Sequence, residues 1–175
     1  MAEDAKRQTC DECGRACGPA DVHRIDDEPI CARCLYGQVE PVTIRPIGVV
    51  ANDKRRRQTG FGTTGGEVSE IRLAPGMARF LHGLADESHL TVVWLLHAQR
   101  PLRTRFNRGW DGKEVGPFAS RTPDRPTPIA VTDVELLGIE GTTLTVRGLD
   151  AIDGTPVLDI KVAPQSLRGT PRGDG

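Results

Sequence analysis

The hydrophobic positions of this chain recur mainly at the two-residue spacing of β-strands. VSEIRLA at 68–74 alternates apolar with polar residues, and HLTVVWLLHA at 89–98 is a continuous apolar run that indicates a buried strand. A hairpin turn is expected at Gly141, and further strands are expected at 43–51, 128–140, 143–149 and 155–163. Short strands separated by turn residues predict a mainly β domain, either a sandwich or a barrel.

One helical pattern interrupts the strands. After Pro75, the stretch MARFLHGLADES at 77–88 places Met77, Phe80, Leu81 and Leu84 at helical spacing. We therefore expect one short helix just before the strand at 89–98.

All five cysteines lie within the first 34 residues. Two CxxC pairs, separated by seventeen residues, have the spacing of a tetrahedral zinc site, with the ligands Cys10, Cys13, Cys31 and Cys34. Four thiolates complete the coordination of the ion, so the zinc is expected to be structural rather than catalytic. Cys17 is interpreted as a bystander and His23 as a loop histidine, although His23 could replace one sulfur. The alternative is a set of unpaired or redox-active cysteines.

The length of 175 residues allows one ordinary domain and a small appendage. We expect a zinc ribbon-like module at 1–38, a β domain at 39–164 and a disordered tail at 165–175. No apolar run is long enough for a membrane span, and the first residues lack the apolar segment of a secretory signal. Together with the clustered cysteines, this predicts a cytoplasmic protein without a membrane partner.

The net charge of −1 conceals a segregation of charge along the chain. Residues 41–128 hold fourteen basic and eight acidic side chains, whereas both flanking regions are acidic. An excess of positive charge in the middle is a candidate surface for a polyanion such as RNA, although a solvated face without a partner would give the same pattern.

Several motifs occur in an order that resembles the TrmO (TsaA-like) family. They are PIGVV at 46–50, RQ at 57–58, LADESHL at 84–90, an apolar strand ending at His97, FASRTPDRPTPIA at 118–130 and LDAIDGTPVLDIK at 149–161. The resemblance implies a small antiparallel β-barrel that uses S-adenosylmethionine and acts as a homodimer. The implied reaction is methylation of the N6 nitrogen of threonylcarbamoyladenosine beside the anticodon of a tRNA.

The resemblance also implies the residues of the site. The cofactor-binding positions that match the family motifs are Arg57, Gln58, His97, Arg125, Thr132, Asp133, Asp150, Ala151, Ile152 and Asp153. A general base would assist loss of the N6 proton, and the catalytic candidates are His97 and Asp153. The residues expected to hold the anticodon stem-loop through phosphate contacts and stacking are Arg55, Arg56, Arg103, Arg105, Arg108, Arg121 and Trp110, with Phe106 as a second stacking candidate.

Two positions depart from the family pattern RPNPIG. Thr127 replaces the asparagine and Ala130 replaces the glycine of that motif, so an asparagine-specific contact to the acceptor cannot be made unchanged. Two alternatives therefore stay open, namely a methyltransferase of the same fold that acts on a small molecule or another acceptor, and a non-catalytic zinc-ribbon protein that binds RNA. Binding of S-adenosylmethionine separates the second alternative from the others.

Overall fold

The computed structural model describes residues 7–53, 67–98 and 101–164. The chain divides into two compact units. Unit 1 contains residues up to Thr43 together with Ala98–Pro128, and unit 2 contains Ile44–His97 and the chain from Ile129 onward. The sequence places the segment 98–128 in the barrel domain, whereas in the structure this segment folds with the cysteine-containing residues. The predicted tail at 165–175 lies outside the described residues.

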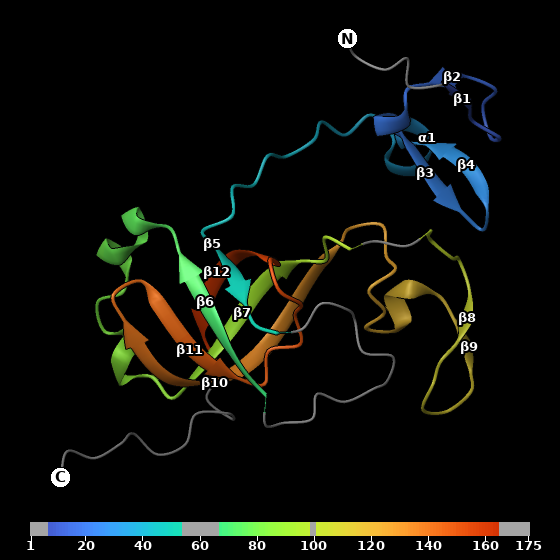
Figure 1. The fold of residues 1–175 in the computed structure, drawn as a ribbon. Helices are drawn as coiled ribbons and strands as arrows, with labels where there is room; N and C mark the ends of the chain where they lie inside the picture. The colour runs from blue at the N-terminus through green and yellow to red at the C-terminus, as the bar shows by residue number, and fades with distance from the viewer. Residues whose placement is uncertain (1–6, 54–66, 99–100, 165–175) are drawn as a thin grey trace. The chain divides into compact units, whose positions relative to one another are not determined.

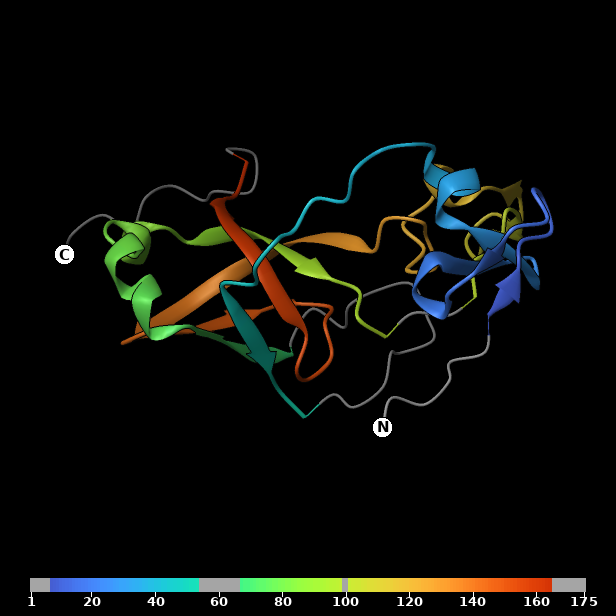
Figure 2. The same ribbon diagram turned by 90° about the horizontal axis from the view of Figure 1, so that it is seen from above.

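Unit 2 is built around a closed antiparallel barrel, as the alternating pattern and the family resemblance predict. Its strands follow one another around the barrel in the order β10, β11, β6, β5, β12 and β7. Figures 1 and 2 show these strands wrapped around one core. The strands are β5 (Gly48–Ala51), β6 (Val68–Leu73), β7 (His89–Leu95), β10 (Ile129–Glu140), β11 (Thr143–Arg147) and β12 (Pro156–Val162).

The barrel core follows from the two-residue period of the strands. On β7, Leu90, Val92 and Trp94 are buried while the residues between them are only partly covered. β6 and β11 contribute buried residues in the same alternating way. Apolar side chains from every strand thus meet in one cluster, whose fully buried members include Val50, Ile71, Leu144, Val146 and Val157.

The helix expected at 77–88 is instead two short 3-10 helices, Pro75–Phe80 and Leu84–Asp86. Gly83 caps the N-terminus of the second helix at a φ of +77°, and this left-handed conformation interrupts the helical path between the two. Met77, Leu81 and Leu84 pack against the core as the spacing predicts, but Phe80 is exposed. Both views place this pair of helices at one end of the barrel and the loop 149–155 at the other (Figures 1 and 2).

Unit 1 contains short elements only. They are β1 (Gln8–Thr9), β2 (Ala16–Cys17), a 3-10 helix (Pro19–Asp21), β3 (Val22–Ile25), β4 (Glu28–Cys31), α1 (Ala32–Tyr36), β8 (Phe106–Asn107), β9 (Glu114–Val115) and a 3-10 helix (Pro117–Ala119). β3 and β4 form a hairpin whose turn residues, Asp26 and Asp27, both have positive φ. No helix among the described residues is long and apolar enough to cross a membrane.

Gly48 provides a test of barrel packing. A Cβ atom at this position would lie 2.5 Å from the carbonyl oxygen of Arg72 and 2.8 Å from the Cα atom of Leu73 on the paired strand β6. Gly48→Ala should therefore lower the free energy of unfolding of the barrel by about 1–3 kcal/mol. The measurement is urea unfolding followed by Trp94 fluorescence in a Trp110→Phe background.

Gly138→Ala is the matched control, because a Cβ atom there has no neighbour within 4 Å. Its expected change in unfolding free energy is within about 0.5 kcal/mol. Equal free energies of unfolding for the two variants would show that the close approach of β5 and β6 at Gly48 does not restrict side-chain size at that position.

Candidate functional sites

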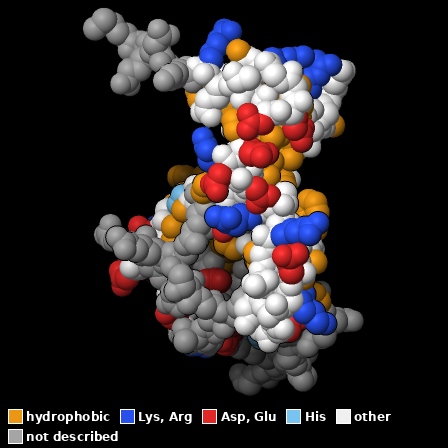
Figure 3. All heavy atoms as spheres, turned by 90° about the vertical axis from the view of Figure 1, so that its right-hand side faces the viewer, with side chains coloured by type: hydrophobic (Ala, Val, Ile, Leu, Met, Phe, Trp, Pro, Cys, Tyr) orange, Lys and Arg blue, Asp and Glu red, His pale blue; other side chains and the backbone are white. Residues whose placement is uncertain are grey.

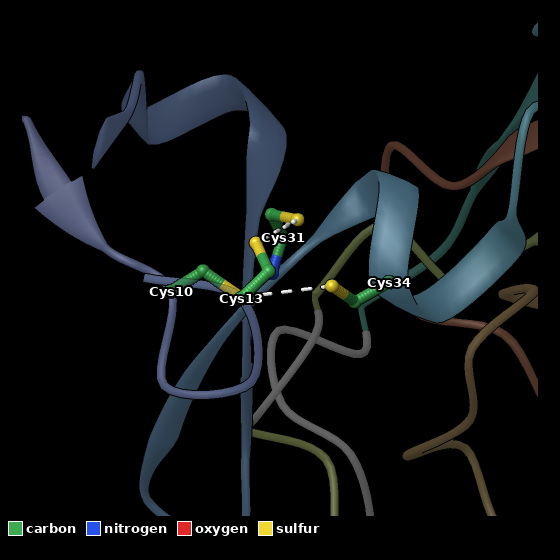
Figure 4. A group of neighbouring side chains, drawn as sticks. All are labelled: Cys10, Cys13, Cys31 and Cys34. Atoms are coloured by element: carbon green, nitrogen blue, oxygen red, sulfur yellow. Dashed lines mark hydrogen bonds between the residues drawn. The ribbon is translucent and has the colours of Figure 1, made fainter. Parts of the chain in front are cut away.

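Two turns bring four cysteine sulfurs of unit 1 together. Cys10 and Cys13 lie on the turn after β1, Cys31 ends β4, and Cys34 lies in α1. The four Sγ atoms lie within 4.8 Å of one another, with 3.9 Å between Cys10 and Cys34 and 3.8 Å between Cys13 and Cys31 (Figure 4). Zn–S bonds of about 2.3 Å in a tetrahedron place the sulfurs about 3.8 Å apart, so the observed spacing fits a zinc ion.

The backbone around the cluster favours thiolates at two of the four positions. The N–H of Cys31 donates to the Cys10 sulfur at 3.3 Å and lowers the pKa of Cys10 to about 6. The N–H of Cys34 likewise lowers the pKa of Cys31, whereas crowding by the other sulfurs, Cys31 first, raises the pKa of Cys34. A divalent cation would relieve this crowding, because it stabilises all four thiolates at once.

The two other candidates in the module lie beside the cluster. Cys17 is buried against Cys10 and Cys31, and burial raises the pKa of its thiol. The His23 ring packs edge-on against Tyr36, with 5.3 Å between the ring centroids. The metal-ligand group found among the described residues consists of the four predicted cysteines and includes neither Cys17 nor His23.

The loop that carries the predicted cofactor residues lies at the barrel end where β5 and β7 finish and β12 begins. The backbone N–H of Gly154 donates to the carbonyl oxygen of Val50 at 2.8 Å, and the backbone N–H of Val50 donates to the carbonyl oxygen of Thr155 at 2.9 Å. Gly154 has a φ of +74°, which lets the chain turn sharply into β12. These contacts fix the loop to β5, with the side chains of Asp150 and Asp153 exposed.

Asn52, which sequence reasoning missed, connects this loop to two strands. Its backbone N–H donates to Oδ1 of Asp153 at 3.2 Å, and its side-chain amide donates at 3.0 Å to both Ala151 O and the buried Ser69 hydroxyl. The only available sequence signal is a single amide residue directly after a strand, which also occurs in ordinary turns. The geometry shows that Asn52 orients the Asp153 carboxylate.

His97 reaches the same end of the barrel from the end of β7. Its Nδ1 lies 3.3 Å from the hydroxyl of Thr155, which is fully buried and two residues beyond Asp153. The imidazole itself is exposed. The structure therefore brings together His97 and the loop of Asp150, Ala151, Ile152 and Asp153, with Thr155 as a further residue that the sequence reading did not select.

Thr132 and Asp133 lie within β10 rather than in that loop. The indole N–H of Trp94 donates to the Thr132 hydroxyl at 3.1 Å, and the Thr91 hydroxyl donates to Asp133 at 2.5 Å. Both contacts join β10 to β7. Four further predicted residues, Arg55, Arg56, Arg57 and Gln58, lie outside the described part of the chain.

The remaining predicted residues, Arg103, Arg105, Arg108, Trp110, Arg121 and Arg125, belong to unit 1. The turn between β8 and β9 is built around Arg108. Its guanidinium pairs with Asp111 and donates to Ala119 O at 3.2 Å. The same group stacks over the Trp110 ring, 4.4 Å from the ring centroid. The Arg108 side chain is only 19% exposed, so it shapes this turn. Arg105 is 76% exposed and has a long contact of 3.5 Å with Glu114.

The face drawn in Figure 3 carries described side chains of both charges. On the face drawn in Figure 3, Lys and Arg side chains of the described residues alternate with Asp and Glu and form no single patch that spans the face. Among the described residues of 41–128, part of the positive charge is neutralised by neighbours, as in the Arg108–Asp111 pair.

Known proteins resemble large parts of this chain. A probable S-adenosyl-L-methionine-binding protein of Methanothermobacter thermautotrophicus is 42% identical over 123 residues, which cover 69% of this chain and 88% of that protein. A tRNA (adenine(37)-N6)-methyltransferase of Mus musculus is 37% identical over 84 residues, 46% of this chain and 20% of that protein.

Solved structures agree with this similarity. TrmO from Pseudomonas aeruginosa superposes with a TM-score of 0.57 and 27% identity, over 73% of this chain and 58% of that chain. The chain thus spans less than two thirds of the length of this structural relative. The family model of the tRNA-methyltransferase O N-terminal domain matches residues 53–165, most of the chain. The chain therefore belongs to the tRNA-methyltransferase O (TrmO) family of S-adenosylmethionine-dependent methyltransferases.

Proposed function

We propose that this protein transfers a methyl group from S-adenosylmethionine to the N6 nitrogen of threonylcarbamoyladenosine beside the anticodon of a tRNA. The observation that carries the proposal is the family match over residues 53–165, which includes the barrel and its loop 149–155. The names of the relatives support the two halves of the reaction, since the archaeal relative is described as binding S-adenosylmethionine and the mouse relative as methylating adenine 37 of tRNA. Such an enzyme would work in the cytoplasm, as the sequence predicts.

The loop beside His97 offers groups that suit this cofactor. Asp150 and Asp153 are exposed carboxylates on one loop, able to accept hydrogen bonds from ribose hydroxyls or to face a sulfonium cation. Asn52 and the β5 contacts hold the loop in one conformation, so little order has to be gained on binding. The proposed cofactor residues are Arg57, Gln58, His97, Arg125, Thr132, Asp133 and Asp150–Asp153.

When bound, S-adenosylmethionine supplies an activated methyl group for in-line displacement. The protein then has to align the acceptor nitrogen with that group and accept the proton that the nitrogen loses. Nδ1 of His97 faces Thr155, which leaves Nε2 as the ring nitrogen for proton transfer. Oδ1 of Asp153 accepts from Asn52, which directs the carboxylate from the loop. Both are candidates for the base.

The proposed RNA contacts are restricted by the geometry of unit 1. Arg103, Arg105 and Arg121 are candidates for phosphate binding, whereas Arg108 acts through the turn that presents Trp110. Trp110 is 56% exposed and could stack on an unpaired base. A homodimer, as the family resemblance implies, and one structural zinc at Cys10, Cys13, Cys31 and Cys34 complete the proposal.

A second acceptor class is favoured by one observation. Thr127 and Ala130 replace residues of the family motif RPNPIG, and Thr127 is exposed on the proline-rich segment. A loss of the asparagine amide alters what that segment can hydrogen-bond. A small molecule or another acceptor is therefore the alternative, and it shares the cofactor site with the main proposal.

The metal prediction is that the purified protein holds one zinc ion. Cys34→Ser should reduce the zinc content strongly, while Cys17→Ala should keep it, because Cys17 lies outside the four-sulfur group. Chelation should unfold the cysteine module and leave the barrel folded, since the barrel has its own core. Elemental analysis and limited proteolysis provide the readouts. Wild type with less than about half an equivalent of zinc and residues 10–34 still protected from protease would contradict the prediction.

The cofactor prediction concerns Asp153. Asp153→Ala should weaken S-adenosylmethionine binding by about 5- to 150-fold, the cost of removing one partner of a charged hydrogen bond. Arg125→Ala should have an effect of similar size if the proline-rich segment contacts the cofactor. Asp159→Ala is the control, because Asp159 lies on β12 and pairs with Lys161 at 2.5 Å. If calorimetry detects no binding of S-adenosylmethionine to the wild-type protein at millimolar concentration, the proposed methyltransferase activity is excluded.

The acceptor prediction is that tRNA carrying threonylcarbamoyladenosine is methylated, whereas the same tRNA without that modification is not. Mass spectrometry of the nucleosides after reaction decides this. Arg105→Ala should reduce the magnitude of the slope of log affinity against log salt by about one. The variant makes one phosphate contact fewer, so its binding releases fewer counterions from the tRNA. Arg72→Ala on β6 is the control and should keep the slope. Tight cofactor binding without methylation of any tRNA would favour the small-molecule acceptor.

A further inference from the structure

The inserted segment, residues 101–128, belongs to the family match but folds against residues that lie outside it. The match begins at residue 53, after the cysteine module, and runs through the segment. In the structure, however, this segment shares a compact unit with the module, not with the barrel strands on either side of it. The module is therefore in contact with a part of the methyltransferase domain.

The first contact extends the hairpin of β3 and β4. Leu102 pairs in parallel with Ile25, its N–H donates to Arg24 O at 2.8 Å, and its carbonyl accepts from Asp26 N at 2.9 Å. The Leu102 side chain is buried. The inserted segment thus begins as a short third strand beside the zinc-module hairpin.

The second contact comes from the turn of that hairpin. The carboxylate of Asp26 accepts the backbone N–H of Thr104 at 3.1 and 3.2 Å and also accepts the Thr104 hydroxyl. The same donors, the hydroxyl first, lower the pKa of Asp26. Thr104 lies between Arg103 and Arg105, so this contact holds the backbone that carries two candidate RNA-binding side chains.

The third contact holds the other end of the segment. The hydroxyl of Tyr36, at the end of α1, donates to Pro126 O at 2.9 Å. Pro126 is adjacent to Arg125 and Thr127 in the family motif. Tyr36 lies two residues after Cys34, and Cys31 ends the strand β4, so both anchors are close in the chain to zinc ligands.

We propose that the zinc module positions the inserted segment, with Asp26 and Tyr36 as positioning residues, so that bound zinc controls the arginines that this segment presents. Unit 1 has few buried side chains besides the cysteines and their neighbours, and so small a core requires a metal to fold. Release of zinc therefore removes both anchors. The structural part of the proposal is independent of the reaction, and its effect on tRNA rests on the proposed function.

The inserted segment leaves and re-enters the barrel at the end that carries the candidate cofactor loop. β7 and β10 are antiparallel neighbours with Leu95 opposite Ile129, so the chain leaves the barrel at His97 and returns at the same end. That end also carries the loop with Asp153. A segment held in one conformation binds RNA through its arginines at a lower entropic cost than a free loop of the same length.

The experiment uses the full zinc-loaded chain and three variants at the hairpin turn. Asp26→Gly removes the carboxylate that holds Thr104, and Asp27→Gly is the matched control, since both positions have positive φ that glycine adopts without strain. Asp26→Asn keeps an acceptor oxygen and should rescue the contact. Tyr36→Phe removes only the hydroxyl that reaches Pro126.

Amide hydrogen exchange is the first readout. Exchange at Leu102 and Thr104 should rise at least about tenfold in Asp26→Gly and on zinc release, and stay near the wild-type rate in Asp27→Gly and Asp26→Asn. Zinc content and exchange of the barrel amides should be unchanged in every variant. Unchanged exchange at Leu102 and Thr104 after zinc release, or equal effects of Asp26→Gly and Asp27→Gly, would overturn the proposal.

The second readout is steady-state methylation. Asp26→Gly and Tyr36→Phe should raise the KM for tRNA several-fold while the KM for S-adenosylmethionine changes less, a separation that general destabilisation would not produce. An equal rise in both KM values would overturn the positioning role. If wild type methylates no tRNA while the exchange results hold, the proposed function fails and the structural coupling stands.

Discussion

The pairing of β7 along both of its edges is the constraint on which the barrel depends. β7 bonds to β10 on one side and to β12 on the other, which closes the sheet and leaves no open edge among the six barrel strands. Because β7 and β10 run antiparallel, the long insertion between them starts and finishes at one barrel end. The same closure places His97, Asn52 and the loop 149–155 at that end. The location of the candidate site is thus a consequence of strand order.

A different constraint operates in unit 1. Its strands are two to four residues long, and its buried side chains are mainly sulfur-bearing, so burial of apolar surface alone is a weak source of stability. In the proposed zinc-bound state, four thiolates around one ion replace a hydrophobic core. The proposed coupling of this module to the inserted segment would give the zinc a role in the domain that matches the family.

The sequence predicted those features of the structure that depend on residues close to one another in the chain. Alternating apolar residues predicted the strands, the family resemblance implied the barrel, and CxxC spacing predicted the four-sulfur cluster. Helical spacing at 77–88 gave one helix where Gly83 divides two, because a single left-handed residue outweighs a weak periodicity. The pairing of Leu102 with Ile25 has no local signal, since it depends on a contact 77 positions away in the chain. For the same reason Asn52 and Tyr36 were missed, and the structural role of Arg108 was not foreseen.

In the function proposed for this protein, the barrel end at His97 binds S-adenosylmethionine. Titration of isotopically labelled, zinc-loaded protein with S-adenosylmethionine, monitored by amide chemical shifts, tests this binding. The largest shifts are expected at Asn52, Asp153 and Gly154, with the cysteine cluster unchanged. Saturable shifts confined to other barrel residues, or no shifts at millimolar cofactor, would contradict it.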